Sequence, residues 1–416
     1  MPSASRATAP SGPTASAHAT PTGDDLVRRA AEMRPLLIER QAETERRTYY
    51  AEDVHEMFRE GGFYRMLIPR RYGGLALPFA DYARVLVELA HGCAGTAWCF
   101  GLAAAHALQV GSYFEKHVQD EVFGDGEFRA ASVAAPGVVA RREDGGWRLD
   151  GTVGYCSGAP YSTHFVGQAL VHGLPKEEQA RRMLLYIAPR SEWTMLDDWG
   201  GDLGLKGSGS HSIRFDGGRI PADYALEGVD MISVDVDGGT PGYALHGDAL
   251  YSGRSMAPFT MTLCAITVGA GYAALDAFEE ELRTRRTALP PIVPRLTDPD
   301  YHRWYGEGLA KIATAEAALM RCATEHHALC ERTAAGGPPY SAEEEVRLGA
   351  IAREAMLQAI AAVEGPLRQS VGAGVLDDGA RFTRILRDLA MVAAHRNTVM
   401  REPLYRVLAG LRLGLA

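Results

Sequence analysis

The stretch "WGGDLGLKGSGSHSIRFDGGRIPADYAL" (Trp199–Leu226) combines a glycine-rich loop with a short run of alternating apolar and polar residues. Similar short runs, such as "RAASVAA", "HFVGQALVHG" and "RMLLYIAP", occur before it and are bounded by turn residues. A spacing of about ten residues between such runs is typical of strands joined by tight turns. We therefore predict a small antiparallel β-domain over residues 129–240.

Longer segments with apolar residues at helical spacing lie on both sides of this β-domain. Residues 23–128 predict an N-terminal helical domain, and residues 241–416 predict a C-terminal four-helix bundle. The first 22 residues are mainly Ala, Ser, Thr and Pro, which predicts a disordered tail over residues 1–22. The expected fold class is therefore α+β, with helices, sheet and helices in that order.

The composition excludes several classes of partner. With 52 acidic and 43 basic residues the formal net charge is −9, so a basic face for nucleic acid or an anionic membrane is not expected. No apolar run approaches the roughly 18 to 20 residues that span a bilayer. The six cysteines are scattered without a CxxC pair, which predicts reduced thiols and a cytoplasmic location.

Two local patterns resemble cofactor or metal motifs, but their surroundings do not support them. Gly269, Gly271 and Ala274 in "VGAGYAAL" match a GxGxxA dinucleotide loop, yet no βαβ pattern surrounds them. We interpret them as small residues that let a long helix pack closely. His326 and His327 have no further ligands at metal spacing, so no metal site is predicted.

Four blocks resemble the acyl-CoA dehydrogenase superfamily and occur in the order found there. They are "IPRRYGGLALPFADYARVLVELAHGCAGTAW" (68–98), the Trp199–Leu226 stretch, "ITVGAGYAALDAF" (266–278) and "RFTRILRDLAMVAAH" (381–395). Together they extend across nearly the whole chain after the tail. The resemblance implies a helical domain, a β-domain and a helical bundle, assembled as a homotetramer.

Two differences from the dehydrogenases favour another branch of this superfamily. The T-E-P-x-x-G-S-D segment of the dehydrogenases is replaced by "AASVAAPGVVA" (130–140), and "RDLAMVAAHRNT" lacks their catalytic glutamate. A carboxylate suits removal of an α-proton from a thioester, whereas an imidazole suits a phenol or peroxide proton. His395, which we place on the last long helix, resembles the catalytic histidine of two-component flavin-dependent monooxygenases. These aromatic hydroxylases receive reduced flavin from a separate reductase.

Two further segments resemble the same branch. "GTAWCFGLAAAHALQ" places Trp98 and His106 eight residues apart, as in the branch members, where this pair lines the aromatic substrate pocket. "GGWRLDGTVGYCSGAPYSTHFV" resembles a segment whose serine lies beside the flavin ring, and that serine is Ser157 here. The resemblance thus implies catalytic roles for His395 and Ser157 and substrate contacts for Trp98 and His106.

The resemblance also implies a mechanism. Reduced FMN or FAD would react with dioxygen to give a C4a-hydroperoxide, which would hydroxylate a phenolic or polycyclic aromatic substrate. Ser157 would form a hydrogen bond near flavin N5, His395 would remove the phenolic proton, and His106 would orient the same oxygen. Arg285 or Arg286 would contact flavin phosphates bound by a neighbouring subunit. Arg387 and Asp388 are expected to form a structural ion pair.

Three alternatives stay open from the sequence. The first is an acyl-CoA-dehydrogenase-type desaturase, which needs a carboxylate base. The second is a monooxygenase that hydroxylates nitrogen instead of a ring carbon. The third is a flavoprotein or scaffold of this fold without catalytic activity. No nicotinamide fingerprint in a βαβ unit is present, so the electrons are expected to come through a flavin reductase.

Overall fold

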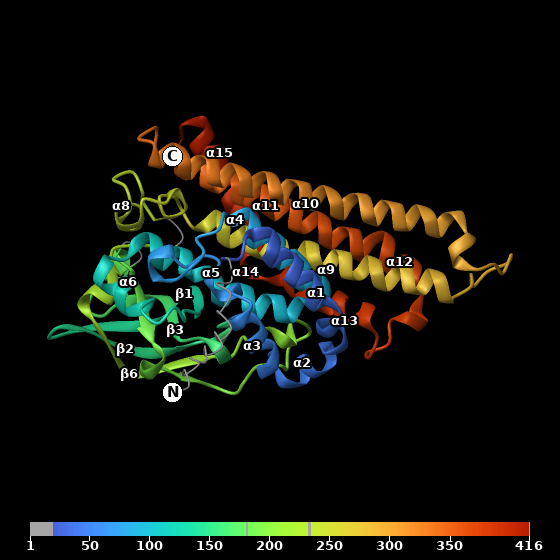
Figure 1. The fold of residues 1–416 in the computed structure, drawn as a ribbon, viewed down its shortest axis with the longest axis horizontal. Coiled ribbons are helices and arrows are strands. Elements are labelled where there is room, and N and C mark those ends of the chain that lie inside the picture. The colour runs from blue at the N-terminus through green and yellow to red at the C-terminus, as the bar shows by residue number, and fades with distance from the viewer. Residues whose placement is uncertain (1–19, 180–181, 232–233, 416) are drawn as a thin grey trace, which may run out of the picture.

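A computed structural model describes residues 20–179, 182–231 and 234–415. N-terminal helices, a sheet and a long helical bundle follow one another along the chain, which confirms the predicted fold class (Figure 1). Most of the predicted tail, residues 1–19, lies outside the described residues. Thr22, at its end, caps the first helix by accepting the backbone N–H of Asp25 at 3.2 Å.

The N-terminal part consists of helices, one of which is fully buried. The helices are α1 (Gly23–Glu39), α2 (Gln41–Arg47), α3 (Glu52–Glu60), α4 (Phe79–Gly92), α5 (Ala94–Tyr113) and α6 (Lys116–Val122). Every residue of α5 is buried, and α5 packs against α4, against the first strand and against the bundle. A helix that is apolar on all faces must be covered on all sides. This composition therefore places α5 at the centre of the fold.

Seven strands form one sheet in the order β5-β6-β2-β1-β3-β4-β7. They are β1 (Ala130–Glu143), β2 (Gly146–Val153), β3 (His164–Val171), β4 (Leu184–Pro189), β5 (Thr194–Met195), β6 (Ile213–Pro221) and β7 (Ala225–Glu227), with the short helix α7 (Lys176–Gln179) before β4.

The prediction of a purely antiparallel sheet was wrong at one pair of strands. β1 and β3 run parallel, with Ala130 beside His164 and Ala140 beside Val171. Each connection reverses the chain direction, but β6 occupies the free edge of β2, so β3 pairs with β1 instead. Two reversals separate β1 from β3, and they therefore point the same way.

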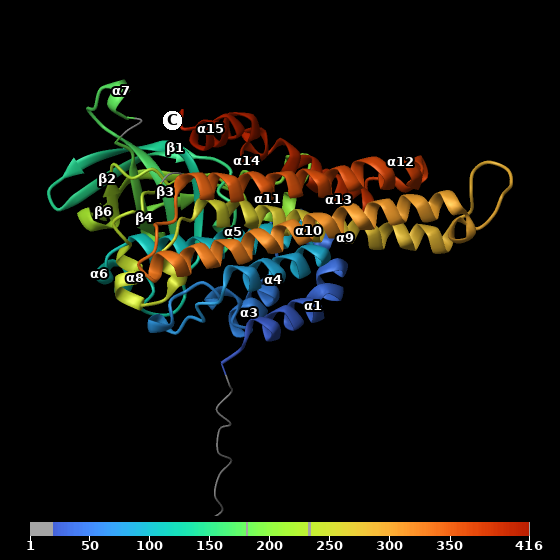
Figure 2. The ribbon, with the colours of Figure 1, turned by 90° about the horizontal axis from the view of Figure 1, so that it is seen from above.

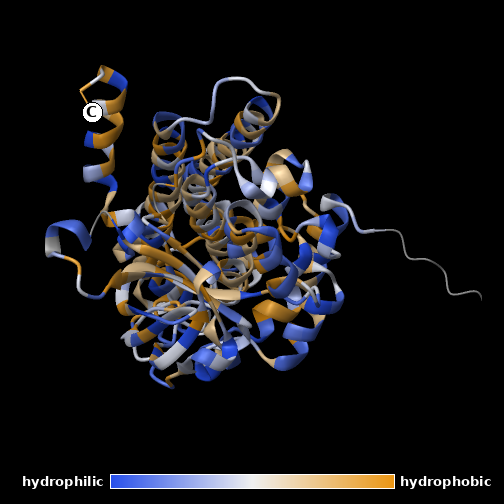
Figure 3. Cartoon of the chain, turned by 90° about the vertical axis from the view of Figure 1, so that its left-hand side faces the viewer, coloured by the Kyte–Doolittle hydropathy of each residue, from blue (hydrophilic) through white to orange (hydrophobic). Residues whose placement is uncertain are grey.

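The C-terminal part contains the predicted bundle. Its helices are α8 (Pro241–His246), α9 (Met256–Thr284), α10 (Pro299–Ala334), α11 (Ala342–Ala362), α12 (Arg368–Val371), α13 (Arg381–Ala394), α14 (Arg396–Val399) and α15 (Arg401–Leu413). α9 packs against α10, α11 and α13. Figure 2 shows the N-terminal helices on one side of this bundle, and Figure 3 shows α15 standing apart at its edge. α9 has the length and composition to cross a membrane, but 89% of its most apolar window is buried inside the fold.

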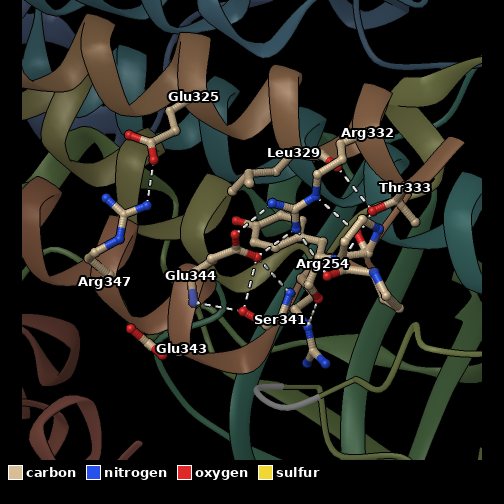
Figure 4. A network of polar contacts seen from close by, with 12 residues as sticks. Arg254, Glu325, Leu329, Arg332, Thr333, Ser341, Glu343, Glu344 and Arg347 are labelled. Atoms are coloured by element: carbon tan, nitrogen blue, oxygen red, sulfur yellow. Dashed lines mark hydrogen bonds and ion pairs between the residues drawn. The ribbon is translucent and has the colours of Figure 1, made fainter. Parts of the chain in front are cut away.

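Polar contacts close the hairpin between α10 and α11 (Figure 4). Arg332 donates two hydrogen bonds of 2.8 Å to the Glu344 carboxylate, and Ser341 caps α11. The next residue, Glu345, accepts the backbone N–H of Met256 at 2.8 Å. The hairpin thereby fixes the N-terminal end of α9.

Candidate active site

Trp98 and Ser157 are in direct contact, although 59 positions separate them in the sequence. Trp98 lies in the first half of α5, and Ser157 lies in the turn after β2. The indole Nε1–H donates to Ser157 Oγ at 2.9 Å, and both side chains are buried. The structure therefore brings together two of the residues that the sequence singled out.

Two further serines extend this contact. Ser210 Oγ lies 2.8 Å from Ser157 Oγ and 2.6 Å from Ser208 Oγ. A hydroxyl group has one donor and two acceptor positions. Trp98 fills one acceptor position of Ser157, and Ser210 fills the other when it donates. The Ser157 O–H then remains available as a donor to a ligand.

His395 lies beside the same tryptophan, with ring centroids 5.5 Å apart and the planes at 74°. The sequence predicted a continuous helix here, but α13 ends at Ala394 and His395 has an extended backbone with ψ 143°. Its Nδ1 accepts the backbone N–H of Asn397 at 3.2 Å and so caps α14. Capping satisfies a backbone donor that has no partner within the short helix.

This cap determines which nitrogen of His395 carries the proton. A backbone N–H can only donate, so Nδ1 presents its lone pair and the neutral ring carries its proton on Nε2. Burial, with a smaller contribution from Arg396, lowers the pKa of His395 to about 4. His395 is therefore neutral near pH 7 and presents Nε2–H as a donor.

This pKa predicts how stability depends on pH. As the pH falls below about 6.5, the unfolded chain binds a proton at this position before the folded chain does. The stability contributed by neutral His395 is thus present above that pH and is lost as the pH falls toward about 4. Between about pH 5 and 6, urea denaturation of wild type should lose up to about 1.4 kcal/mol per pH unit more than His395→Ser. Parallel curves would mean that folded His395 is already protonated.

His106 differs from His395 in the nitrogen that carries its proton. It lies eight residues after Trp98, about 12 Å farther along the axis of α5. Its Nδ1 lies 2.7 Å from the Leu102 carbonyl oxygen, which can only accept, so Nδ1 carries the proton and Nε2 the lone pair. Burial lowers the pKa of His106 to about 4. His106 is therefore neutral near pH 7, with its Nδ1 proton on the Leu102 carbonyl and with the backbone of Ala130 as a second neighbour of the ring, whereas His395 is a neutral donor.

A small cavity adjoins His106 between α5 and α9. Its volume is about 10 Å³, room for about one water. Among its lining residues, Gln109 has a buried Oε1 without a hydrogen-bond partner in the described ranges. The ring of Phe259, which is only partly buried, lies 5.7 Å from the His106 ring. The cavity beside His106 is therefore too small for an aromatic ligand unless its lining side chains move.

Trp98, Ser157, Ser210 and His395 are called the Trp98 cluster below. Arg285 and Arg286 lie far from this cluster within one chain. They follow the C-terminal end of α9, a helix of 29 residues that extends about 43 Å. Figure 1 shows this end of α9 at the tip of the bundle that is remote from the sheet. Arg285 pairs with Glu281, and Arg286 donates to the Ile292 carbonyl at 2.5 Å.

The predicted ion pair between Arg387 and Asp388 was wrong. Arg387 binds Glu45 at 3.2 Å and also Asp378, whereas Asp388 accepts the backbone N–H of Leu205 at 2.6 Å. Consecutive residues of a helix do not face each other, so the two side chains reach different partners.

Four further residues of this site were not predicted from the sequence: Ser208, Ser210, Tyr155 and Trp199. The sequence "GSGSHS" shows hydroxyl groups in a glycine-rich loop, which was a usable signal for Ser210. Tyr155 has φ 61°, a left-handed conformation that is uncommon outside glycine. Its side chain is 65% exposed, and its ring centroid lies 5.6 Å from that of Trp199. Its place two residues before Ser157 was the available signal.

One group of possible metal ligands occurs in the described ranges, at the start of α3. Ligand atoms of Glu52, His55 and Glu56 lie within 4.8 Å of one another. Two of these side chains already have protein partners, since Arg59 binds Glu56 at 2.8 Å and Tyr64 Oη lies 2.9 Å from His55 Nδ1. This group shares no residue with the Trp98 cluster.

The turn that carries Ser157 offers two of the contacts that a flavin ring needs. Such a ring needs a hydrogen-bond partner at its polar edge and flat apolar contacts over its faces. The Ser157 O–H supplies the donor, and the exposed ring of Tyr155 beside Trp199 supplies an aromatic surface. A Cβ at Gly158 would lie 2.7 Å from Ala103 Cβ, so the turn is packed directly against α5.

Known proteins share both the sequence blocks and the architecture. The acyl-CoA dehydrogenase N-terminal domain matches residues 24–117, and the acyl-CoA dehydrogenase C-terminal domain matches residues 261–400. The oxygenase component of p-hydroxyphenylacetate 3-hydroxylase from Acinetobacter baumannii is 26% identical over 91% of this chain and 86% of its own length. The oxygenase subunit HsaA of a flavin-dependent monooxygenase from Rhodococcus jostii is 26% identical over 85% of this chain and 89% of its own.

A solved structure gives the same fold. XiaF from Streptomyces sp., in complex with FADH2 and glycerol, superposes with a TM-score of 0.84 at 22% identity, covering 95% of this chain and 96% of XiaF. The two family domains together match more than half of the chain, and the relatives match most of its length. The chain therefore belongs to the acyl-CoA dehydrogenase family, in its branch of flavin-dependent monooxygenase oxygenase components.

Proposed function

We propose that this protein hydroxylates a phenolic or polycyclic aromatic substrate, using dioxygen and reduced FMN or FAD from a separate flavin reductase. The observation that carries the proposal is the contact of Trp98 with both Ser157 and His395. In the described part of the chain, no carboxylate is a hydrogen-bond partner of these three side chains, whereas a desaturase needs a carboxylate base. Two relatives named as oxygenase components, of p-hydroxyphenylacetate 3-hydroxylase and of an FADH2-dependent resorcinol hydroxylase, support the need for a reductase. Conversion of a phenol to a catechol with chemically reduced flavin and dioxygen tests the proposal.

We assign a role in this reaction to each of these residues. Bound reduced flavin supplies the electrons that activate dioxygen. Ser157 would hold the polar edge of the flavin ring, and Tyr155 with Trp199 would cover its apolar part. Arg285 or Arg286 of a neighbouring subunit would bind the phosphates in the proposed homotetramer. Trp98, Ser157 and Ser210 are buried, which excludes water from this part of the site, whereas His395 is only partly buried.

His106 would accept a hydrogen bond from the substrate, and His395 would donate one to the oxygen that becomes negatively charged. The lone pair on His106 Nε2 accepts the phenolic O–H and so orients the ring. His395 Nε2–H donates to an oxygen on which negative charge develops. We therefore assign acceptance of the substrate proton to His106 instead of His395, because the His395 proton already occupies Nε2.

Ser157→Ala should weaken both flavin binding and the use of dioxygen. A hydrogen bond of this kind contributes about 0.5 to 1.5 kcal/mol, so we expect reduced flavin to bind roughly three- to tenfold more weakly. The share of consumed dioxygen released as hydrogen peroxide should rise in parallel. Ser162→Ala is a matched control, because Ser162 is buried in the same turn and its Oγ donates to the Gly158 carbonyl at 2.8 Å. Equal flavin affinity and peroxide release in wild type and Ser157→Ala would leave Ser157 as a turn residue only.

A further inference from the structure

The glycine-rich loop Gly204–Ser210 is attached at its beginning to helix α13. Asp388 Oδ1 accepts the backbone N–H of Leu205 at 2.6 Å, and both residues are buried. Leu205 has φ 50°, a left-handed conformation that persists only where the surroundings hold it. A Cβ at Gly204 would lie 2.1 Å from the Arg387 carbonyl oxygen, so the loop is in contact with the backbone of α13.

The end of the same loop holds the turn that carries Ser157. Ser210 Oγ lies 2.8 Å from Ser157 Oγ. The Ser208 carbonyl accepts the N–H of Gly158 at 3.1 Å, and the Gly209 carbonyl accepts the N–H of Ala159 at 3.2 Å. Three contacts therefore transmit the position of the loop to the turn.

We propose that Asp388 is a positioning residue that sets Ser157 through the loop Gly204–Ser210. The proposal rests on the proposed function, in which Ser157 binds the flavin ring. α13 ends at Ala394, and His395 follows it, seven residues after Asp388 and about 10 Å farther along the helix axis. Asp388 thus fixes Ser157 relative to His395, so that both stay in contact with Trp98.

The proposal depends on Asp388 as a hydrogen-bond acceptor, a role that does not require a charge. The nearby cations have another anionic partner, since Arg384 and Arg387 lie 3.0 and 3.2 Å from Glu45. Burial raises the pKa of Asp388 to about 7, against the opposing effects of the Leu205 N–H and the two arginines. An amide of the same shape presents the same oxygen to Leu205. Asp388→Asn should therefore keep the contact that Asp388→Ala removes.

Hydrogen exchange of the flavin-free chain tests the loop contact without any reaction. In Asp388→Ala, backbone amides in peptides covering residues 204–211 and 155–160 should exchange roughly tenfold faster than in wild type, because a buried N–H loses its partner. Asp388→Asn should stay within about twofold of wild type. Ile385→Ala is the control, since this buried residue lies on α13 one turn before Asp388. It should lower Tm by creating a cavity and leave both peptides at wild-type rates.

Turnover with reduced flavin tests the consequence for Ser157. Asp388→Ala should release several-fold more of the consumed dioxygen as hydrogen peroxide, while Asp388→Asn and Ile385→Ala should match wild type. Unchanged exchange in Asp388→Ala, or peroxide release no greater than in Ile385→Ala, would overturn the proposal. So would an Asp388→Asn variant that behaves like Asp388→Ala. Absence of product in wild type would contradict the proposed function instead, and the proposal would then be decided by the exchange rates.

Discussion

His395→Ala is expected to lower product formation by about a hundred- to a thousandfold, while dioxygen is still consumed and released as hydrogen peroxide. The structure presents His395 Nε2–H as a donor in a partly buried position beside Trp98. Removing one preorganised donor from an active site typically costs a rate factor of about this size. The measurement is product formed per dioxygen consumed, with reduced flavin supplied in excess.

Two further substitutions separate the donor role from the capping role. Ser and Asn are both good N-cap residues, worth about 1 kcal/mol relative to Ala. His395→Ser keeps the cap but has no donor that reaches as far as Nε2, so it should be more stable than His395→Ala and equally inactive. His395→Asn keeps the cap and an amide N–H and should recover part of the product. Full activity in His395→Ser would mean that His395 serves only to cap α14.

The order of the elements could be predicted because it depends on local patterns, since strand alternation and helical spacing indicated the α+β class. Trp98, Ser157 and His395 were selected by the family resemblance of their segments, but their mutual contact was not predicted. The parallel pairing of β1 with β3 could not be predicted, because it depends on β6 occupying the edge of β2. Alternation within a strand does not specify its neighbour.

The chemistry of each histidine also lay outside the sequence patterns. Whether an imidazole donates or accepts at Nε2 depends on the partner of Nδ1, which is an N–H for His395 and a carbonyl for His106. Asp388 likewise looked like half of an ion pair until its partner, 183 positions away, was placed beside it. Such partners come from tertiary packing, and spacing along a helix does not reveal them.

The second large expected effect is the loss of turnover when no reduced flavin is supplied, because turnover should then be absent. The segment "VGAGYAAL" that resembles a dinucleotide loop lies inside the buried part of α9, where its glycines pack against neighbouring side chains and backbone. The purified chain should therefore not oxidise NADH or NADPH, even with oxidised flavin and substrate present. An unrelated flavin reductase should restore turnover, because reduced flavin can diffuse between proteins.

The most direct test mixes the chain with a phenol and chemically reduced FMN or FAD, without any reductase or nicotinamide, and then admits isotopically labelled dioxygen. We expect a hydroxylated product that carries one labelled oxygen atom, and we expect the chain to bind reduced flavin more tightly than oxidised flavin. Product formation that consumes NADH with the chain alone would contradict the need for a separate reductase. Turnover of an acyl thioester with a dye acceptor in the absence of dioxygen would contradict the monooxygenase assignment itself.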